Sequence, residues 1–246
     1  GQGLEYMQSR QYVPGDPVKS IDWRITARTG KVHVKEYESP KSLPVWFIVD
    51  TSASMALSSI KVSKYQIATQ IAGGLALASI DRVSPVGILG AGSRDLNVKP
   101  SLSRETILQW LHELRTYQFN EPTRLGEKLL ALNPSLGENS LIFVLSDLHD
   151  PSAIPALKLL GHRHDIVVIP LRDPAEDSIP GAGFIRGREV ETGREATLST
   201  KKQFTCLEAL TTALKKASLD HFPVRTDQPF LASLRLFLQS RNLLSR

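Results

Sequence analysis

The sequence of 246 residues has only one cysteine, Cys206, so no disulfide can form within the chain. A single thiol is typical of proteins from a reducing compartment. Cys206 lies in the stretch KKQFTCLEAL, for which we predict a helix. We therefore expect a packed thiol at this position rather than a nucleophile.

Long hydrophobic runs are also absent. No segment approaches the roughly 20 apolar residues that a membrane-crossing helix needs, and the longest candidate, residues 71–80, predicts the buried part of a helix. A signal-peptide pattern is missing too. The sequence starts at Gly1 rather than Met, so we expect a fragment or a trimmed chain. The expected location is the cytoplasm, or a membrane reached through a partner or an upstream segment.

Two catalytic motifs are missing. The chain has no G-x-x-x-x-G-K-[ST] phosphate loop and no G-x-S-x-G nucleophile elbow, so we predict neither an ATPase nor a serine hydrolase. His162 and His164 are too few ligands for a zinc site and indicate a solvated turn. For the acidic loop with Asp173, Glu176 and Asp177 we also expect solvation.

Positive charge is in mild excess, with a net charge of +5, but no dense Lys/Arg block occurs. Residues 1–43 do interleave basic residues with aromatic ones, a pattern that can grip single-stranded nucleic acid. The basic residues are Arg10, Lys19, Arg24, Arg28, Lys31 and Lys35, and the aromatic ones are Tyr12, Trp23 and Tyr37. We favour a small β-rich extension in which aromatic side chains such as Trp23 pack on the main domain. Nucleic-acid binding stays an alternative.

From residue 44 onward, short apolar runs typical of buried strands alternate with helical patterns. The runs VWFIV, LIFVL and IVVIPL are the strongest strand signals. This alternation predicts an α/β fold with a doubly wound, mainly parallel sheet and helices on both faces. We expect two parts, residues 1–43 as a β-rich extension and residues 44–246 as the α/β domain.

The motif D-x-S-x-S follows the first of these strands, with Asp50, Ser52 and Ser54 at its carboxyl end. In an open α/β sheet, ligands gather at this edge. A carboxylate and hydroxyls are hard oxygen donors that suit Mg²⁺. The alternative for the two serines is helix capping in an ordinary polar turn.

Two further residues extend this donor set. Thr123 stands at the start of a predicted helix, and Asp147 follows LIFVL as Asp50 follows VWFIV. Two carboxylates would balance a divalent charge, and three hydroxyls would add donors. A sixth position would be left for water or for an acidic group of a partner.

The order of these residues resembles the metal-ion-dependent adhesion site of von Willebrand factor A domains. The stretch GLEYMQSRQYVPGDPVKSIDWRITARTGKVHVKEYE, followed by DTSASM, SDLHD, LRDPAED and ETGRE, resembles the domain-of-unknown-function 58 family over essentially the whole chain. The resemblance implies a von Willebrand A-type domain, often encoded beside MoxR-type AAA+ ATPases. It also implies metal ligands at Asp50, Ser52, Ser54, Thr123 and Asp147.

The expected function is a metal-dependent protein-interaction module, an adaptor or partner of a MoxR-type ATPase in a chaperone-like or complex-maturation system. Its cofactor would be Mg²⁺ or Mn²⁺, and its client would supply an acidic residue to the metal. We predict no enzymatic activity. The alternatives are a metal-dependent hydrolase, which would need an unassigned His or Glu beside the five oxygens, and a nucleic-acid-binding domain.

Overall fold

The protein is described by a computed structural model. The described residues are 5–38, 43–115, 121–137, 139–178, 184–188, 195–199 and 207–241. The chain divides into two compact units, Gly1–Ser42 and Leu43–Arg246. The prediction for Cys206 falls outside the described residues.

The N-terminal unit is built on an antiparallel pair, β1 (Glu5–Gln11) and β2 (His33–Glu38). Between the strands lie a short 3-10 helix, η1 (Val18–Ser20), and an α-helix, α1 (Trp23–Thr29). The helix begins at Asp22, which accepts hydrogen bonds from two backbone amides, and ends at Gly30 with φ of 69°. The side chain of Trp23 was expected to be buried, but it is 68% exposed.

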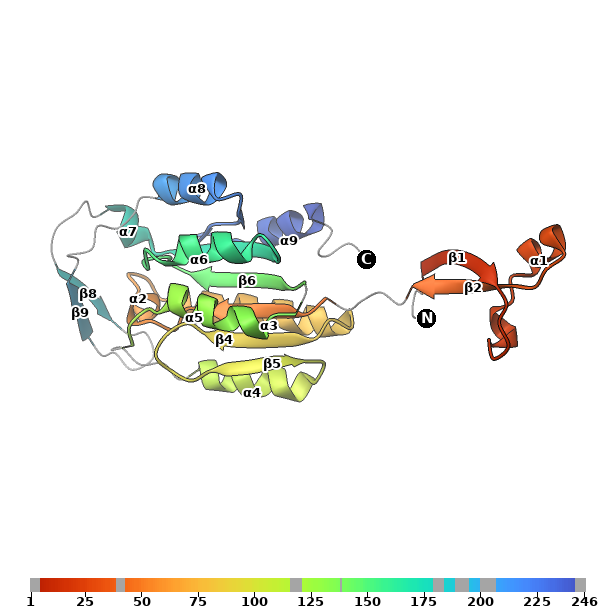
Figure 1. The fold of residues 1–246 in the computed structure, drawn as a ribbon. Coiled ribbons are helices and arrows are strands. Elements are labelled where there is room, and N and C mark those ends of the chain that lie inside the picture. Colours follow the sequence, from red (N-terminus) through yellow and green to blue (C-terminus); the bar gives the residue numbers. More distant parts are fainter. Residues whose placement is uncertain are drawn as a thin grey trace. The chain divides into compact units, whose positions relative to one another are not determined.

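The larger unit contains a mainly parallel sheet with the strand order β10-β7-β6-β3-β4-β5, and β11 also pairs with β7 (Figure 1). The strands are β3 (Val45–Val49), β4 (Val86–Gly90), β5 (Asn97–Ser101), β6 (Leu141–Ser146), β7 (Asp165–Arg172), β10 (Asp220–His221) and β11 (Val224–Arg225). Only β5, at the edge, is antiparallel to its neighbour. The predicted α/β fold is confirmed.

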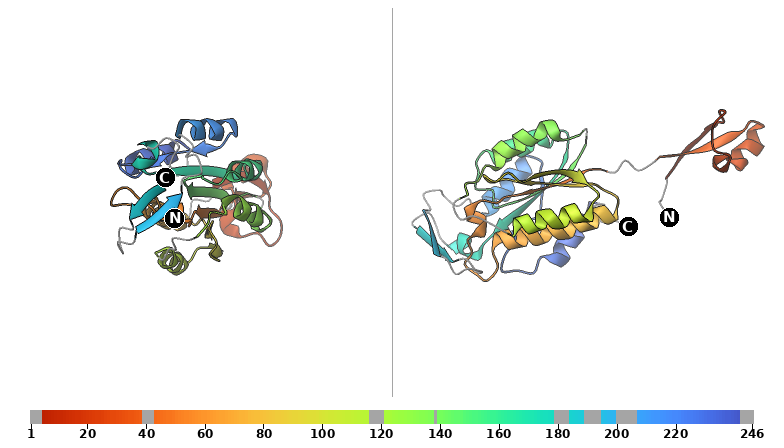
Figure 2. Two further views of the ribbon diagram at one scale, coloured as in Figure 1. Left: turned by 90° about the vertical axis from the view of Figure 1, so that its left-hand side faces the viewer. Right: turned by 90° about the horizontal axis from the view of Figure 1, so that it is seen from below.

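Helices cover both faces of this sheet (Figure 2). One face packs against α3 (Lys64–Asp81), α4 (Arg104–Leu114) and α9 (Leu231–Ser240). The other packs against α5 (Leu125–Leu132), α6 (Ala153–Leu160) and α8 (Leu207–Lys216). The remaining elements are α2 (Ala53–Ala56), η2 (Asn133–Ser135), α7 (Pro174–Ser178) and the antiparallel pair β8 (Phe184–Arg188) and β9 (Glu195–Ser199).

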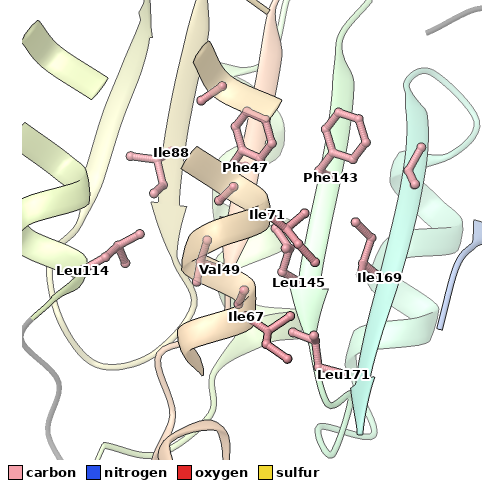
Figure 3. Packing of buried hydrophobic residues seen from close by; sticks show 14 of the residues in the cluster. Phe47, Val49, Ile67, Ile71, Ile88, Leu114, Phe143, Leu145, Ile169 and Leu171 are labelled. Atoms are coloured by element: carbon pink, nitrogen blue, oxygen red, sulfur yellow. The ribbon is translucent and has the colours of Figure 1, made fainter. Parts of the chain in front are cut away.

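Strand β3 is the centre of the core because it is buried on both faces. Phe47 and Val49 point to the side of α3, where Phe47 stacks on Phe143 of β6 with ring centroids 5.3 Å apart (Figure 3). Trp46 and Ile48 belong to the cluster on the opposite face. Burial of four large side chains fixes this strand, at about 1.5–3 kcal/mol for each, and so fixes the residues that follow it.

Candidate metal centre

Asp50 ends the central strand and is completely buried. Its amide donates to the Leu145 carbonyl of β6 at 2.9 Å, which continues the parallel ladder by one residue. Its Oδ1 accepts the amide of Ser52 at 3.0 Å, so the chain turns sharply into α2. The Asp50 carboxylate therefore has a fixed position at the carboxyl edge of the sheet.

The two serines of the motif lie beside this carboxylate. Ser52 is the N-cap residue of α2, yet its side chain makes no capping hydrogen bond. Its Oγ lies 3.0 Å from Oγ of Ser54 instead. The helix-capping alternative for Ser52 is therefore wrong, and both hydroxyls belong to one cluster of oxygens.

Asp147 follows β6 and is also completely buried. Strands β3 and β6 pair in parallel with Val49 opposite Leu145, so their carboxyl ends meet. The intervening Ser146 donates a 2.6 Å hydrogen bond to Oδ2 of Asp50, and Ser54 hydrogen-bonds Asp147. The two carboxylates thus share one polar cluster.

Thr123 completes the predicted set, although it precedes α5 by two residues rather than standing at its start. Its Oγ1 lies 3.5 Å from Oδ2 of Asp50, at the limit of a hydrogen bond. The neighbouring Arg124 amide donates to the Ala91 carbonyl after β4 at 3.0 Å. The structure therefore brings all five predicted residues together from three separate segments.

Burial and charge act on Asp50 in the same direction. Removal from water and the negative charge of Asp147 raise the pKa of Asp50 to about 6. Hydrogen bonds from Ser146 and Ser52 lower this pKa, but they do not offset the two larger effects. The two carboxylates therefore repel each other in the absence of a cation. Two carboxylates and three hydroxyls are a hard-oxygen set, so these residues fit a small divalent ion.

Asp147 also contacts groups that the sequence reasoning missed. Lys64, at the first position of α3 and 2% exposed, donates to Oδ2 of Asp147 at 2.8 Å and also pairs with Glu176. Burial alone would raise the pKa of Asp147, but the charge and the hydrogen bond of Lys64 hold it well below its usual range. The ring Nδ1 of His149 lies 3.3 Å from Oδ2 of Asp147.

The acidic loop after β7 is not solvated, contrary to the prediction. Glu176 is only 7% exposed and pairs with Lys64 and Arg172. Asp173 is 4% exposed and accepts hydrogen bonds from Ser58 and Ser59. The side chain of Asp177 is outside the described residues. Among the described residues, Asp147, His149 and Glu176 form the one group of three or more acidic, histidine or cysteine side chains close enough to share a metal.

Another buried carboxylate, Glu121, connects two of the segments that carry the site. It accepts hydrogen bonds from the Thr51 hydroxyl at 2.8 Å and from the Arg94 amide at 2.9 Å, and it pairs with the Arg94 guanidinium at 3.0 Å. Its carbonyl accepts the Ala53 amide. Burial alone would raise the pKa of Glu121, but these hydrogen bonds outweigh it and lower the pKa. Glu121 therefore ties the segment before Thr123 to the D-x-S-x-S loop.

The other histidine prediction is partly wrong. His162 is exposed, as expected, but His164 is 6% exposed and neither of its ring nitrogens has a hydrogen-bond partner within the described structure. Leu160 of α6 positions the His164 backbone by accepting its amide at 3.0 Å. His164 is therefore a buried ring rather than part of a solvated turn, and it is not in the one candidate metal group found among the described side chains.

One of the basic residues named for the nucleic-acid alternative is held in an ion pair. Arg10 makes two short hydrogen bonds to the carboxylate of Asp16, at 2.7 and 2.8 Å, and lies 3.4 Å from Glu36. An arginine held in such a bidentate pair would have to break it before it could contact a phosphate. The other five basic residues of the segment and Trp23 are exposed, so nucleic-acid binding stays an alternative; these basic residues are Lys19, Arg24, Arg28, Lys31 and Lys35.

Comparison with known proteins identifies the family. The model described as "Protein of unknown function DUF58" matches residues 8–217. The chain belongs to this family. Uncharacterized proteins of Mycobacterium tuberculosis and Mycobacterium bovis are 24% identical to this DUF58 chain over 261 residues, covering 98% of it and 80% of each relative.

A solved structure shares the fold of this DUF58 protein. The conserved hypothetical protein BatB from Bacteroides thetaiotaomicron superposes with a TM-score of 0.56 and 14% identity, over 82% of this chain and 98% of its own. The VWA domain of SpRpn10 gives a TM-score of 0.48 and 12% identity, over 78% and 93%. In the described part of the DUF58 chain, every helix is too short or too polar to cross a membrane.

Proposed function

We propose that this DUF58 protein is a metal-dependent protein-interaction module. Its metal, Mg²⁺ or Mn²⁺, would be held by the five oxygen-bearing residues Asp50, Ser52, Ser54, Thr123 and Asp147. The observation that carries the proposal is their convergence at the carboxyl edge of the sheet, although the chain supplies them from segments up to 97 residues apart.

The chemistry of the site favours a bridging role. A divalent cation would supply a Lewis-acidic centre for an oxygen ligand from a partner. Asp50 and Asp147 would balance its charge, and the hydroxyls of Ser52, Ser54 and Thr123 would add oxygen donors without adding charge. A carboxylate from a partner protein is the donor that such a hard divalent ion prefers.

The proposed partner is a MoxR-type AAA+ ATPase or a protein client of it. This rests on the family resemblance, because DUF58 members are commonly encoded beside such ATPases. The chain would act as an adaptor that presents its metal edge to an acidic residue of the ATPase or client. In this proposal the DUF58 chain itself catalyses no reaction.

Thermal unfolding with and without metal tests the site. A ligand that binds only the native state at 100 times its Kd adds about 2.7 kcal/mol of stability. Mg²⁺ or Mn²⁺ should therefore raise the Tm of the wild type, and Asp50→Asn should lose that response while remaining folded. Asp95→Asn is the matched control, because Asp95 is exposed. A full metal response in Asp50→Asn would remove Asp50 from the site.

Binding to the purified ATPase tests the module. The complex should weaken in EDTA, and Ser52→Ala and Thr123→Ala should weaken it at a fixed concentration of Mg²⁺. Ser135→Ala, at an exposed position of η2, should bind as the wild type does. Binding that is unaffected by EDTA would overturn the metal-dependent part of the proposal.

A second candidate function is metal-dependent hydrolysis, and His149 is the observation that favours it. Its ring touches Asp147, and burial lowers its pKa, which leaves the imidazole neutral as a general base must be. The test measures metal-dependent turnover of p-nitrophenyl phosphate and binding to the ATPase in the wild type and in His149→Gln. Turnover that is lost in His149→Gln while ATPase binding persists would show that the protein is an enzyme rather than an adaptor.

A further inference from the structure

Lys64 lies in an unusual place for a buried lysine. Its side chain is 2% exposed, and it occupies the first position of α3, directly after the N-cap Ser63 and inside the capping box that Ser63 forms with Gln66. A positive charge at a helix N-terminus is opposed by the helix dipole, and burial of an ammonium is costly. The helix therefore gives no reason for a lysine here, and its stabilising contacts must come from outside α3.

Those contacts are the carboxylates of the metal edge. Nζ of Lys64 donates to Oδ2 of Asp147 at 2.8 Å and to Oε1 of Glu176. Asp147 is one of the five oxygens to which the proposed function assigns the metal. Glu176 in turn faces Arg172 at 3.4 Å. Lys64 thus places a fixed positive charge on a carboxylate that a divalent ion would also need.

We propose that Lys64 is an internal counter-cation that competes with the divalent ion for Asp147 and makes occupancy of the site depend on an acidic partner. The assignment of the ion to Asp147 rests on the proposed function. The competition itself concerns only Lys64, Asp147 and an added cation, so it can be measured without any partner protein.

The balance of charge explains the dependence on an acidic partner. Asp50, Asp147 and Glu176 carry three negative charges, and Lys64 and Arg172 carry two positive ones, which leaves one negative charge. A divalent ion reverses this to one positive charge, which a partner carboxylate would neutralise. Without Lys64, the same ion would bring the cluster to zero, and the demand for an outside anion would disappear.

The test is calorimetric titration with Mn²⁺ alone. Lys64→Met should bind Mn²⁺ at least about tenfold more tightly than the wild type. In the wild type, the Lys64 ammonium and the cation would repel each other strongly across a few ångströms at a partly buried site. Lys61→Met is the control, since it removes the same charge from an exposed position three residues earlier. Its Mn²⁺ affinity should equal that of the wild type.

A double variant covers the risk that Lys64→Met does not fold with its carboxylates unpaired. Lys64→Met combined with Glu176→Gln removes one charge of each sign and still frees Asp147 of its competitor, so it should also bind Mn²⁺ more tightly than the wild type. Circular dichroism establishes which variants are folded. A variant that folds only when Mn²⁺ is added also supports the proposal. If neither variant folds even with Mn²⁺, the role of Lys64 is purely structural and the proposal is overturned.

The remaining outcomes separate this inference from the proposed function. Equal or weaker Mn²⁺ binding by folded Lys64→Met, with clear binding by the wild type, overturns the competition and leaves the metal site intact. If Lys64→Met binds Mn²⁺ and the wild type does not, the competition is supported. The same result overturns metal dependence of the native protein, because Lys64 then takes the place of the metal. Absence of Mn²⁺ binding in every folded variant overturns both.

Discussion

The hydroxyl of Thr51 donates a 2.8 Å hydrogen bond to Oε1 of Glu121, a residue 70 positions later in the chain. Both side chains are almost fully buried. A Cβ atom on Gly92 would overlap both of them, so the glycine after β4 is what allows their contact. This bond connects the segment that carries Thr123 with the turn that carries Ser52.

Glu121→Gln should therefore weaken the site without removing a metal ligand. The substitution leaves the partly buried Arg94 without its carboxylate partner, which should lower the free energy of unfolding by about 2 kcal/mol in urea titrations. It should also reduce the metal-induced increase in Tm, because a neutral amide accepts the hydrogen bonds of Thr51 and the Arg94 amide more weakly and so holds the segment before Thr123 less firmly. Glu127→Gln, which breaks an exposed pair with Arg124, should change stability by at most about 1 kcal/mol and leave the metal response intact.

Asp173 makes a comparable connection on the other side of α2. Its carboxylate accepts the Ser59 amide at 2.8 Å, the Ala175 amide at 2.9 Å and the Ser58 hydroxyl at 3.1 Å. Asp173→Ala leaves these donors without an acceptor and should cost about 2–3 kcal/mol in urea unfolding. Asp95→Ala, at an exposed position, should cost less than about 0.5 kcal/mol. Equal costs for the two variants would show that the Asp173 contacts do not stabilise the fold.

The two glycines inside α3 should respond differently to alanine. A Cβ on Gly73 would lie 3.0 Å from Cδ2 of Leu111, whereas a Cβ on Gly74 meets nothing within 4 Å. Close packing therefore requires a glycine at position 73 but not at position 74. Gly74→Ala should stabilise the protein by about 0.8–1 kcal/mol through helix propensity. Gly73→Ala should gain less in the same urea titration, because Leu111 has to move, and an equal gain would contradict the packing role.

The fold and the two aspartates of the candidate site could be predicted from the sequence for one physical reason. Strands buried on both faces need unbroken apolar runs, so VWFIV and LIFVL are conspicuous and the polar residue after each is easily placed. Once Asp50 and Asp147 follow parallel strands, their proximity depends only on whether those strands are neighbours. The structure shows that they are.

The surrounding charges could not be predicted in the same way, because their proximity depends on how loops fold. Glu176 and Asp173 are in a stretch that is as polar as any solvated loop, and only the packing of α7 buries them. Lys64 did carry a signal, since the helical period places it on the same face as the buried Ala68 and Ile71. A lysine on a buried helical face requires a carboxylate partner, but the sequence alone does not identify which one.

His164 should make stability depend on pH in the weakly acidic range. Burial, and then the charge of Arg163, lower the pKa of the His164 imidazole in the folded chain below its ordinary value of 6.5. At a pH between the folded-state pKa and the unfolded-state pKa, the unfolded chain therefore binds a proton that the folded chain does not. The free energy of unfolding should therefore fall as the pH drops below about 6.5. His164→Leu removes this contribution, and its stability should decline less between pH 7 and pH 5 than that of the wild type, in urea titrations at each pH. His162→Leu, at an exposed position two residues earlier, should follow the wild-type curve. Since His149 is unchanged in all three proteins, parallel curves for the wild type and His164→Leu would mean that His164 is protonated equally in the folded and unfolded chain.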